Sequence, residues 1–372
     1  MASPPLAGLR ILEMAGIGPG PFCGMMLADH GAEVIRVERP GASGLTEAAR
    51  DPLLRSRRTI MLDLKKPEAI AAVRRIAATC DGLIEGFRPG VMERLGLGPE
   101  ALLADNPKLV YGRMTGWGQT GPLASEPGHE IDYIAISGTL HALGEAGRKP
   151  VAPMNLVGDF GGGGMMLAFG MLAAILSAQA TGQGQVVDCA MTDGSAVLAS
   201  MIWGFRGMGR WSAARGTNLL DGGAHFYDTY ETADGKWIAV GAIEPQFYAA
   251  LRQVMGLDGA EWEAQFAPAS WPRLKADLAD RFKLRTRDAW VSAFEGHEAC
   301  IAPVLGFDEA IAHPHNVARA TFVTAGGVTQ PAPAPRYSVS ATVPPRMADA
   351  PDGAAILAEA GFTPAEIAAL RF

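Results

Sequence analysis

Two titratable side chains, His129 and Asp159, stand between glycine-rich turns and beside apolar runs. His129 lies in Gly-His-Glu-Ile-Asp-Tyr at 128–133, and Asp159 ends Asn-Leu-Val-Gly-Asp at 155–159. An imidazole and a carboxylate that face one carbon from opposite sides can remove a proton from one face and return it to the other. This requires that their pKa values lie near the working pH. The pair therefore predicts inversion at a weakly acidic carbon through an enolate.

Each member of the pair also has a structural interpretation. A lone histidine is more often a structural side chain than a catalyst. Asp159 stands where an N-cap is expected, ahead of a long apolar helix over about 164–180. The two roles of Asp159 are compatible, because a helix start would also bring backbone N–H donors close to a developing negative charge. Glu244 follows a predicted hairpin, and a carboxylate there could orient an imidazole; a surface loop is the simpler interpretation.

Basic residues follow the ends of predicted strands. Arg39 follows a strand at 33–37, and Arg88 follows a strand at 82–85. Further candidates close by in the sequence are Arg55, Arg57, Arg58, Lys65, Lys66 and Arg94. The carboxyl ends of parallel strands meet at one edge of a sheet, and guanidinium groups bind phosphate oxygens in pairs. A ligand with several phosphates, such as coenzyme A, fits this pattern, and a solvated basic surface fits it as well.

The order of predicted elements indicates an α/β fold with a doubly wound parallel sheet, because strands and helices alternate. Strands are expected at 9–14, 33–37, 82–85, 109–114 and 185–190, and helices at 22–29, 73–79, 99–105, 164–180 and 192–205. A hairpin at 227–243 and helices up to about 294 indicate a smaller α+β domain. We expect a large domain at 1–195, a linker at 196–223, a small domain at 224–311, a linker at 312–335 and a C-terminal segment at 336–372 that returns to the large domain.

The turn that contains Gly16, Gly18 and Gly20 invites comparison with dinucleotide-binding loops, because a strand precedes it. Pro19 and Pro21 remove backbone N–H donors from the loop that would hold a pyrophosphate. The sequence therefore favours a tight strand-to-helix turn and argues against an NAD-dependent dehydrogenase.

Composition excludes several classes of protein. The chain has 372 residues and 48% hydrophobic residues, which suits two globular domains. Its net charge of -7 argues against nucleic-acid binding. The four cysteines are far apart and show no metal-ligand spacing, so neither a metal site nor a disulfide framework is expected. No signal peptide is visible, and the longest apolar run, about 14 residues, is too short to cross a bilayer. A cytoplasmic protein without a membrane span is expected.

The chain resembles the α-methylacyl-CoA racemases, within the family III CoA-transferase (CaiB/BaiF-like) superfamily, from Pro5 to about Ser340. The matching segments are Gly-Ile-Gly-Pro-Gly-Pro at 16–21, Glu-Gly-Phe-Arg-Pro-Gly at 85–90, Arg-Met-Thr-Gly-Trp-Gly-Gln at 113–119, Asn-Leu-Val-Gly-Asp at 155–159, Leu-Asp-Gly-Gly at 220–223 and Ala-Ile-Glu-Pro-Gln-Phe at 242–247. The Gly-His-acid element and the Asp-Gly-Gly segment point to the racemase branch.

The resemblance implies a function and an assembly. His129 and Asp159 would be the two acid/bases, and Glu244 would support His129. Contacts with coenzyme A would come from Ile17, Arg39, Leu62, Asp63, Leu64, Lys65, Gly86, Phe87, Arg88, Arg94, Gly128, Glu130, Ile131, Asp132 and Tyr133. No separate cofactor is implied, since coenzyme A is part of the substrate. The resemblance also implies a Rossmann-like large domain, a role in lipid metabolism and an interlocked homodimer, with each active site between the large domain of one chain and the small domain of the other.

One segment departs from the family, and two other functions stay open. The racemases usually have Gly-His-Asp-Ile-Asn-Tyr, whereas Glu130 and Asp132 stand here. In a CoA-transferase, Asp159 would attack the thioester and form an acyl anhydride, then an aspartyl-CoA thioester. That mechanism has no need of His129. A CoA-binding protein without catalysis is the third possibility.

Overall fold

The computed structural model describes residues 3–41, 48–348 and 350–370 and divides into two compact units. The first unit comprises Met1–Ser137, Met154–Ala199 and Arg319–Phe372, and the second comprises Gly138–Pro153 and Ser200–Ala318. The chain therefore passes between the units several times. The domain limits expected from the sequence stay a prediction, because these units are defined by contacts and not by independent folding.

The first unit is built on a six-stranded parallel sheet in the order β3-β2-β1-β4-β5-β6. The strands are β1 (Arg10–Met14), β2 (Glu33–Glu38), β3 (Arg57–Met61), β4 (Gly82–Glu85), β5 (Val110–Thr115) and β6 (Gln185–Ala190). The strand order reverses between β1 and β4, which is the arrangement of a doubly wound sheet. The predicted α/β class and parallel sheet are confirmed.

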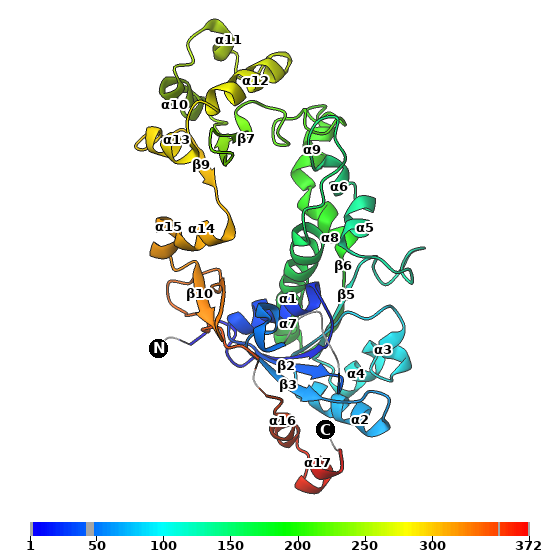
Figure 1. Ribbon diagram of the computed structural model, residues 1–372. Coiled ribbons are helices and arrows are strands. Elements are labelled where there is room, and N and C mark those ends of the chain that lie inside the picture. Colours follow the sequence, from blue (N-terminus) through cyan, green and yellow to red (C-terminus); the bar gives the residue numbers. More distant parts are fainter. Residues whose placement is uncertain (1–2, 42–47, 349, 371–372) are drawn as a thin grey trace. The chain divides into compact units, whose positions relative to one another are not determined.

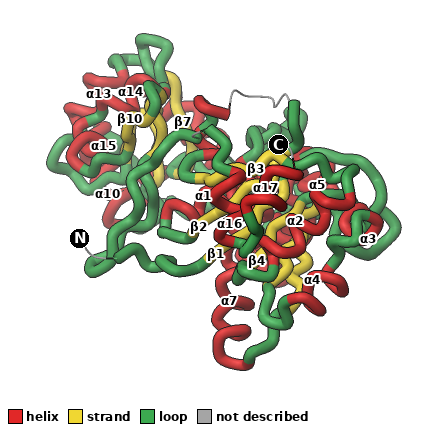
Figure 2. The backbone as a smooth tube through the Cα atoms, turned by 90° about the horizontal axis from the view of Figure 1, so that it is seen from below, coloured by secondary structure: helices red, strands yellow, loops and turns green. Residues whose placement is uncertain are grey.

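Helices cover both faces of this sheet because its strands carry apolar side chains on both sides. Leu12 and Ile35 face a core shared with α2 (Pro67–Ala77), α3 (Val91–Arg94), α4 (Pro99–Asp105), α16 (Gly353–Glu359) and α17 (Pro364–Leu370). Ile11 and Val34 face the opposite core, shared with α1 (Pro19–Asp29) and α7 (Met166–Thr181). Figure 2 shows α2, α16 and α17 over one face of the strands.

Short elements complete the first unit. They are the 3-10 turns η1 (Ala48–Arg50) and η2 (Pro52–Leu54), α5 (Glu130–Ile136), the π-helix η3 (Leu156–Met165), α8 (Met191–Leu198) and the antiparallel pair β10 (Phe322–Ala325) and β11 (Val328–Pro331). Figure 1 shows η3 continuing into α7 as one long helical stretch. By length and composition, the 26 residues Leu156–Thr181 satisfy the requirement for a membrane span, yet 44% of the apolar window is buried inside the protein. The core helix of a folded domain accounts for that burial.

The arginines predicted as a phosphate-binding cluster near β3 have structural partners instead. Arg57 lies within β3 and its buried Nε donates to Glu13 at 3.1 Å. Arg55 donates to Asp29 of α1 and to Gln330 of β11. Burying a charge without a partner is costly, so these guanidinium groups stay with their carboxylates. The prediction that Arg55 and Arg57 bind phosphate is therefore wrong.

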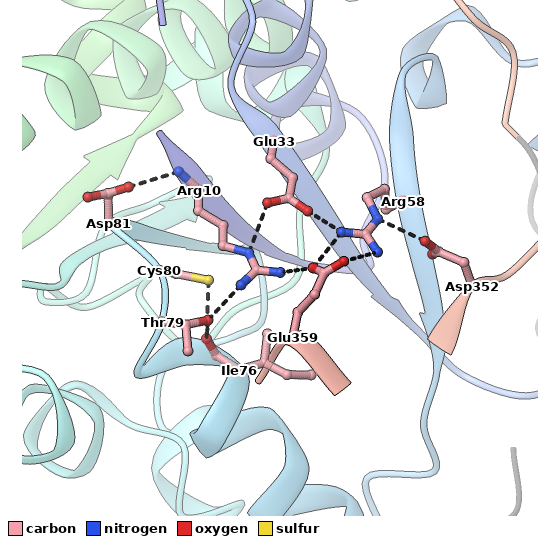
Figure 3. A network of polar contacts seen from close by, with 9 residues as sticks. All are labelled: Arg10, Glu33, Arg58, Ile76, Thr79, Cys80, Asp81, Asp352 and Glu359. Atoms are coloured by element: carbon pink, nitrogen blue, oxygen red, sulfur yellow. Dashed lines mark hydrogen bonds and ion pairs between the residues drawn. The ribbon is translucent and has the colours of Figure 1, made fainter. Parts of the chain in front are cut away.

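Arg58 belongs to a network that joins α16 to the sheet (Figure 3). Its guanidinium contacts Glu33 at the start of β2, Asp352 before α16 and Glu359 at the end of α16. Glu359 also pairs with Arg10 at the start of β1. These residues lie at the amino ends of the strands, opposite the edge where ligands of such sheets bind. Arg58 is thus another structural arginine.

The second unit has its own core and its own sheet, in the order β7-β8-β9. β7 (Tyr227–Glu231) and β8 (Trp237–Gly241) form the predicted hairpin, and β9 (Ile301–Val304) pairs with β8. The helices are α6 (Thr139–Ala142), α9 (Ser200–Gly207), α10 (Pro245–Met255), α11 (Ala260–Glu263), η4 (Pro268–Ser270), α12 (Trp271–Phe282), α13 (Arg287–Ala293), α14 (Phe307–Ala312) and α15 (Pro314–Ala318). Phe226, Trp262 and Phe282 are almost fully buried at its centre.

Candidate functional site

Most of the predicted coenzyme A contacts follow the carboxyl ends of four neighbouring strands. Ile17 follows β1, Arg39 follows β2, residues 62–65 follow β3, and residues 86–88 follow β4. They therefore gather at one edge of the sheet, around the point where the strand order reverses, which is where such sheets bind ligands. The side chains of Arg39, Lys65, Arg88 and Arg94 are exposed and free to meet a ligand from solvent.

Two of the residues predicted to contact coenzyme A have a structural role after β3. The side chain of Leu62 is 3% exposed and belongs to the core, so a ligand can reach only its main chain. Asp63 holds the turn itself, since its carboxylate accepts the N–H of Lys65 at 3.2 Å. Ile17, in contrast, is 65% exposed. Whether these residues bind coenzyme A stays a prediction.

Asp159 lies beside the glycine turn at the end of β1. A Cβ atom on Gly18, whose φ is 66°, would stand 3.2 Å from Oδ2 of Asp159. Helix α1 begins at Pro19, directly after this glycine, and Pro at the first helical position costs no hydrogen bond. The turn is thus shaped to start a helix and to leave room for the carboxylate, and the proline-containing loop is no pyrophosphate cradle.

The expected N-cap role of Asp159 is wrong. The residue before the helical stretch is Asn155, and Asp159 is the fourth residue of η3. The π-helical turn is fixed by an N–H bond from Phe160 to the carbonyl of Asn155 at 3.2 Å. Single π-helical segments are frequent at functional sites, and this one displays Asp159 at the sheet edge.

The glycine run after Asp159 serves close packing. A Cβ at Gly162 would lie 2.6 Å from the N atom of Ser195 in α8, and one at Gly164 would lie 2.7 Å from the Phe22 ring in α1. Side chains larger than hydrogen would push η3 away from both helices. The ring of Phe160 stacks on that of Phe22, with centroids 4.6 Å apart. The glycines therefore seat η3 against α1 and α8, which fixes the place of Asp159.

The carboxylate of Glu130 holds the beginning of η3. Its Oε1 accepts the N–H groups of Val157 at 3.2 Å and Gly158 at 2.8 Å, and its Oε2 accepts that of Asp159 at 3.3 Å. Glu130 is 6% exposed and is the first residue of α5. Helix starts leave such N–H groups without partners. Because Glu130 occupies them, the expectation that these donors stabilise a developing negative charge on a substrate is wrong.

His129 is exposed and stands as the N-cap of α5, directly before Glu130. Its backbone N–H donates to the carboxylate of Asp132 at 3.0 Å, which fixes the main chain at this point. The exposed imidazole is thus carried by an ordered helix start. Ile131, on the same turn, is 48% exposed.

Tyr133 anchors α5 to the end of β5. Its hydroxyl donates to the carbonyl of Gly128, and its ring meets Trp117 edge-on with centroids 4.7 Å apart. A Cβ on Gly116 would overlap the Tyr133 ring at 2.0 Å, so only glycine fits there. The Thr-Gly-Trp-Gly motif therefore positions the segment that carries His129, and Tyr133 is mostly buried.

The surroundings of Asp159 tune its proton affinity. Burial raises the pKa of the Asp159 carboxyl to about 6, and the negative charge of Glu130 adds to the rise. A side-chain hydrogen bond with Asn155 and the charge of His129 lower this pKa by less. A carboxyl group with a pKa near neutrality can both accept and donate a proton in the working range.

A second carboxylate network, which sequence reasoning missed, holds the loop after β4. The Oε2 atom of Glu85 accepts the N–H of Phe87 at 2.7 Å. Arg113 of β5 donates to Glu85 at 3.0 Å and, through a second arm of its guanidinium, to Glu93 of α3 at 2.7 Å. Arg88 and Arg94 flank these anchored positions. The signal was present in the sequence, because Glu85 and Arg113 open the two matching segments at 85–90 and 113–119.

Glu244 lies in the other compact unit. It is exposed and precedes α10, whose first residue is Pro245. Its expected support of His129 therefore stays a prediction, whereas His129, Asp159 and Glu130 all belong to the first unit.

The sequence and the fold both have known relatives. Residues 6–355 match the model of CoA-transferase family III. The chain is 47% identical over 370 residues to the alpha-methylacyl-CoA racemase of Mus musculus, and the alignment covers 98% of this chain and 96% of the relative. It is 44% identical over 366 residues to the alpha-methylacyl-CoA racemase of Homo sapiens, and this alignment covers 97% of this chain and 95% of the relative. A solved CAIB/BAIF family protein from Brucella suis has a TM-score of 0.82 at 27% identity and covers 97% of this chain and 100% of its own.

Proposed function

The chain belongs to CoA-transferase family III, and from this premise we propose that it is a racemase of 2-methylacyl-CoA thioesters. The reaction interconverts the (2R) and (2S) epimers by moving one proton at Cα. The observation that carries this proposal is the pairing of His129 with Asp159. His129 begins α5, Asp159 lies in η3, and Glu130 of α5 accepts N–H groups of η3. The pKa of Asp159 is raised to about 6.

The proposed mechanism uses two bases that share one proton. One of them removes the Cα proton and leaves an enolate, and the other, already protonated, delivers a proton to the opposite face. Two groups on opposite faces invert the centre, whereas a single base tends to return the proton to the face it came from. General acid–base catalysis of this kind contributes about 10² to 10⁴-fold. Coenzyme A enters as part of the substrate, and the mechanism needs no further cofactor.

The position of the pair supports a coenzyme A substrate. Asp159 lies at the end of β1, next to Gly18, and the exposed Arg39 and Arg88 follow β2 and β4 at the same edge. Guanidinium groups at this edge suit the phosphates of a nucleotide. The relatives named above as racemases support the choice of 2-methylacyl groups over other thioesters.

Exchange of the Cα proton with solvent tests the proposal. The parent enzyme is incubated with (2S)- and with (2R)-2-methylacyl-CoA in D2O and followed by NMR. We expect deuterium at Cα together with equilibration of the epimers. His129→Ala and Asp159→Ala are both expected to abolish equilibration. Transfer of coenzyme A to added carboxylic acids without any exchange would overturn the racemase and favour the transferase. Binding of coenzyme A with neither reaction would leave a binding protein.

We also propose that the enzyme is an interlocked homodimer. Large apolar side chains are exposed on α7 and α8 of the single chain, among them Phe169 at 73%, Leu176 at 66% and Leu198 at 50%. Phe169 and Leu176 are seven residues apart and so lie on one face of α7, and exposed apolar side chains on one face favour association. In such a dimer, Glu244 of one chain would support His129 of the other, which suits their separation into different compact units.

Complementation between chains tests this arrangement. When His129→Ala and Glu244→Ala chains are co-expressed with different tags, a mixed dimer contains one site with both substitutions and one site with neither. We expect the purified mixed dimer to have about half the parent activity. Activity no higher than that of the single variants would show that both residues serve one site within one chain. Sedimentation of the parent checks the dimer itself, and cell fractionation checks the proposed cytoplasmic location.

A further inference from the structure

Glu130 connects the two segments that carry the proposed acid/base pair. We propose that Glu130 is a positioning residue of the reaction, which holds the helix of Asp159 against the helix that His129 begins. The inference rests on the proposed racemase function. The family pattern at this point has an aspartate, so the longer side chain is a property of this chain.

The geometry shows a fitted clamp. Glu130 reaches 27 to 29 residues along the chain to accept three successive N–H groups at the start of η3. Gly158 makes room for it, since a Cβ there would lie 2.9 Å from Cγ of Glu130 and 3.0 Å from Cγ2 of Ile134. Asn155, the residue before η3, provides no side-chain cap. Glu130 therefore replaces the missing cap from another helix.

The clamp also joins the two proton-transfer groups in a single unit. The main chain of Glu130 continues directly from His129, while its carboxylate contacts the N–H of Asp159. A displacement of about 1 Å between reacting groups can cost about a hundredfold in rate. Shortening Glu130 by one methylene withdraws the carboxylate by about 1.5 Å, which is enough to break bonds of 2.8 to 3.3 Å.

The charge of Glu130 has a separate effect, because it raises the pKa of Asp159 after the larger effect of burial. The elements packed against η3 carry other charged or titratable groups. These are His129, Asp132 and Tyr133 at α5, Cys23 and Asp29 of α1, Tyr111 and Arg113 of β5, Asp188 and Cys189 of β6, and Asp193 of α8. Among these, His129 acts on the pKa of Asp159, in the lowering direction. The negative charge of Glu130 thus favours the protonated form of Asp159, in addition to the larger effect of burial.

Two variants separate geometry from charge. Glu130→Gln keeps the length and one acceptor oxygen but removes the charge, whereas Glu130→Asp keeps the charge and loses the reach. Glu126→Gln, which changes an exposed carboxylate in the loop before His129, is the matched control. The pH profile of kcat/KM is measured by epimer equilibration in both directions.

The working pair carries one proton, so kcat/KM falls at acid pH, where both groups are protonated. We expect Glu130→Gln to move this acid limb to lower pH by roughly half a unit to one unit. We expect Glu130→Asp to lower kcat at least about tenfold without a comparable movement of the limb. The control keeps the parent profile.

Three outcomes decide the inference. If Glu130→Gln leaves the acid limb in place and merely lowers the rate, Glu130 is structural only and the inference fails. Parent kinetics in both variants would overturn it as well. If the parent itself shows neither exchange nor equilibration at any pH, the proposed function fails instead. The clamp is then judged by urea unfolding at pH 7.5, where Glu130→Asp should be less stable than the parent. Equal stability of the two proteins would overturn the clamp.

Discussion

Replacing Asp159 with asparagine should stabilise the folded protein at neutral pH. The carboxyl pKa is raised from 3.8 to about 6 in the folded state, chiefly because burial disfavours its charge. The folded state therefore binds this proton more tightly than the unfolded state does. Its ionised form lowers stability above pH 6, and this cost disappears as the pH falls through 6 and is absent below 3.8. Asparagine has nearly the same shape and never ionises.

The magnitude follows from the shift. A rise of about two pKa units at 1.36 kcal/mol each gives about 3 kcal/mol, and solvent screening of the partly exposed carboxylate reduces this to roughly 1 to 2 kcal/mol. Urea unfolding at pH 7.5 and at pH 4 measures it. Other titrating groups cancel in the comparison, because parent and Asp159→Asn share them. We expect a gain at pH 7.5 and none at pH 4.

The opposite pattern would refute this reasoning. The Asp159→Asn protein could be less stable than the parent at pH 7.5, or its unfolding free energy could differ from that of the parent by the same amount at both pH values. Either result would show that burial of the ionised carboxylate does not lower the stability of the folded protein. Glu126→Gln, at an exposed position nearby, serves as the control and should show no such pH-dependent gain. Catalytic activity plays no part in the measurement, so the test stands apart from the proposed reaction.

Three further changes probe the framework of the site. Arg113→Lys loses the guanidinium group that donates to both Glu85 and Glu93, so the loop after β4 becomes less ordered. We expect saturation kinetics to give a several-fold higher KM for the acyl-CoA with kcat changed by no more than about twofold. Gly163→Ala places a Cβ 3.0 Å from the carbonyl of Gly158 and should lower unfolding free energy by about 1 to 3 kcal/mol in urea. Glu359→Gln removes partly exposed ion pairs and should cost less than about 1 kcal/mol, a loss that shrinks in 1 M NaCl.

Strand positions with continuous apolar character could be predicted from the sequence. The strands at 82–85 and 185–190 were predicted with their observed limits, and the parallel sheet followed from the alternation of elements. β3 was missed because its sequence, Arg-Arg-Thr-Ile-Met, begins with two charged residues. Arginine is rarely buried without a partner, and the partner of Arg57, Glu13, lies 44 residues away. Local patterns cannot reveal such a pair.

The start of the helix that carries Asp159 was also misplaced, for a related reason. Glycine is among the weakest helix formers, so the sequence of residues 161–164 predicts a loop, with Asp159 as the N-cap of the helix that follows. Tertiary packing decides otherwise, because α1 and α8 approach so closely that only glycine fits at Gly162 and Gly164. The first N–H groups of η3 then donate to the carboxylate of Glu130, so they have partners without a cap at Asp159. Both causes are long-range contacts, which a sequence pattern does not contain.

The carboxylates near this edge of the sheet differ in the hydrogen-bond donors that they accept, which are backbone N–H groups for Glu85, Asp132 and Glu130 and a side chain for Asp159. Glu85 accepts the N–H of Phe87, Asp132 accepts that of His129, and Glu130 accepts three at the start of η3. These bonds fix the main chain at the loop after β4 and at the starts of α5 and η3. Asp159 receives a side-chain hydrogen bond from Asn155, which does not offset burial and the charge of Glu130, and its pKa stays near 6. The carboxylates of Glu85, Asp132 and Glu130 therefore hold the main chain, whereas the raised pKa of Asp159 suits this residue to the proposed proton transfer.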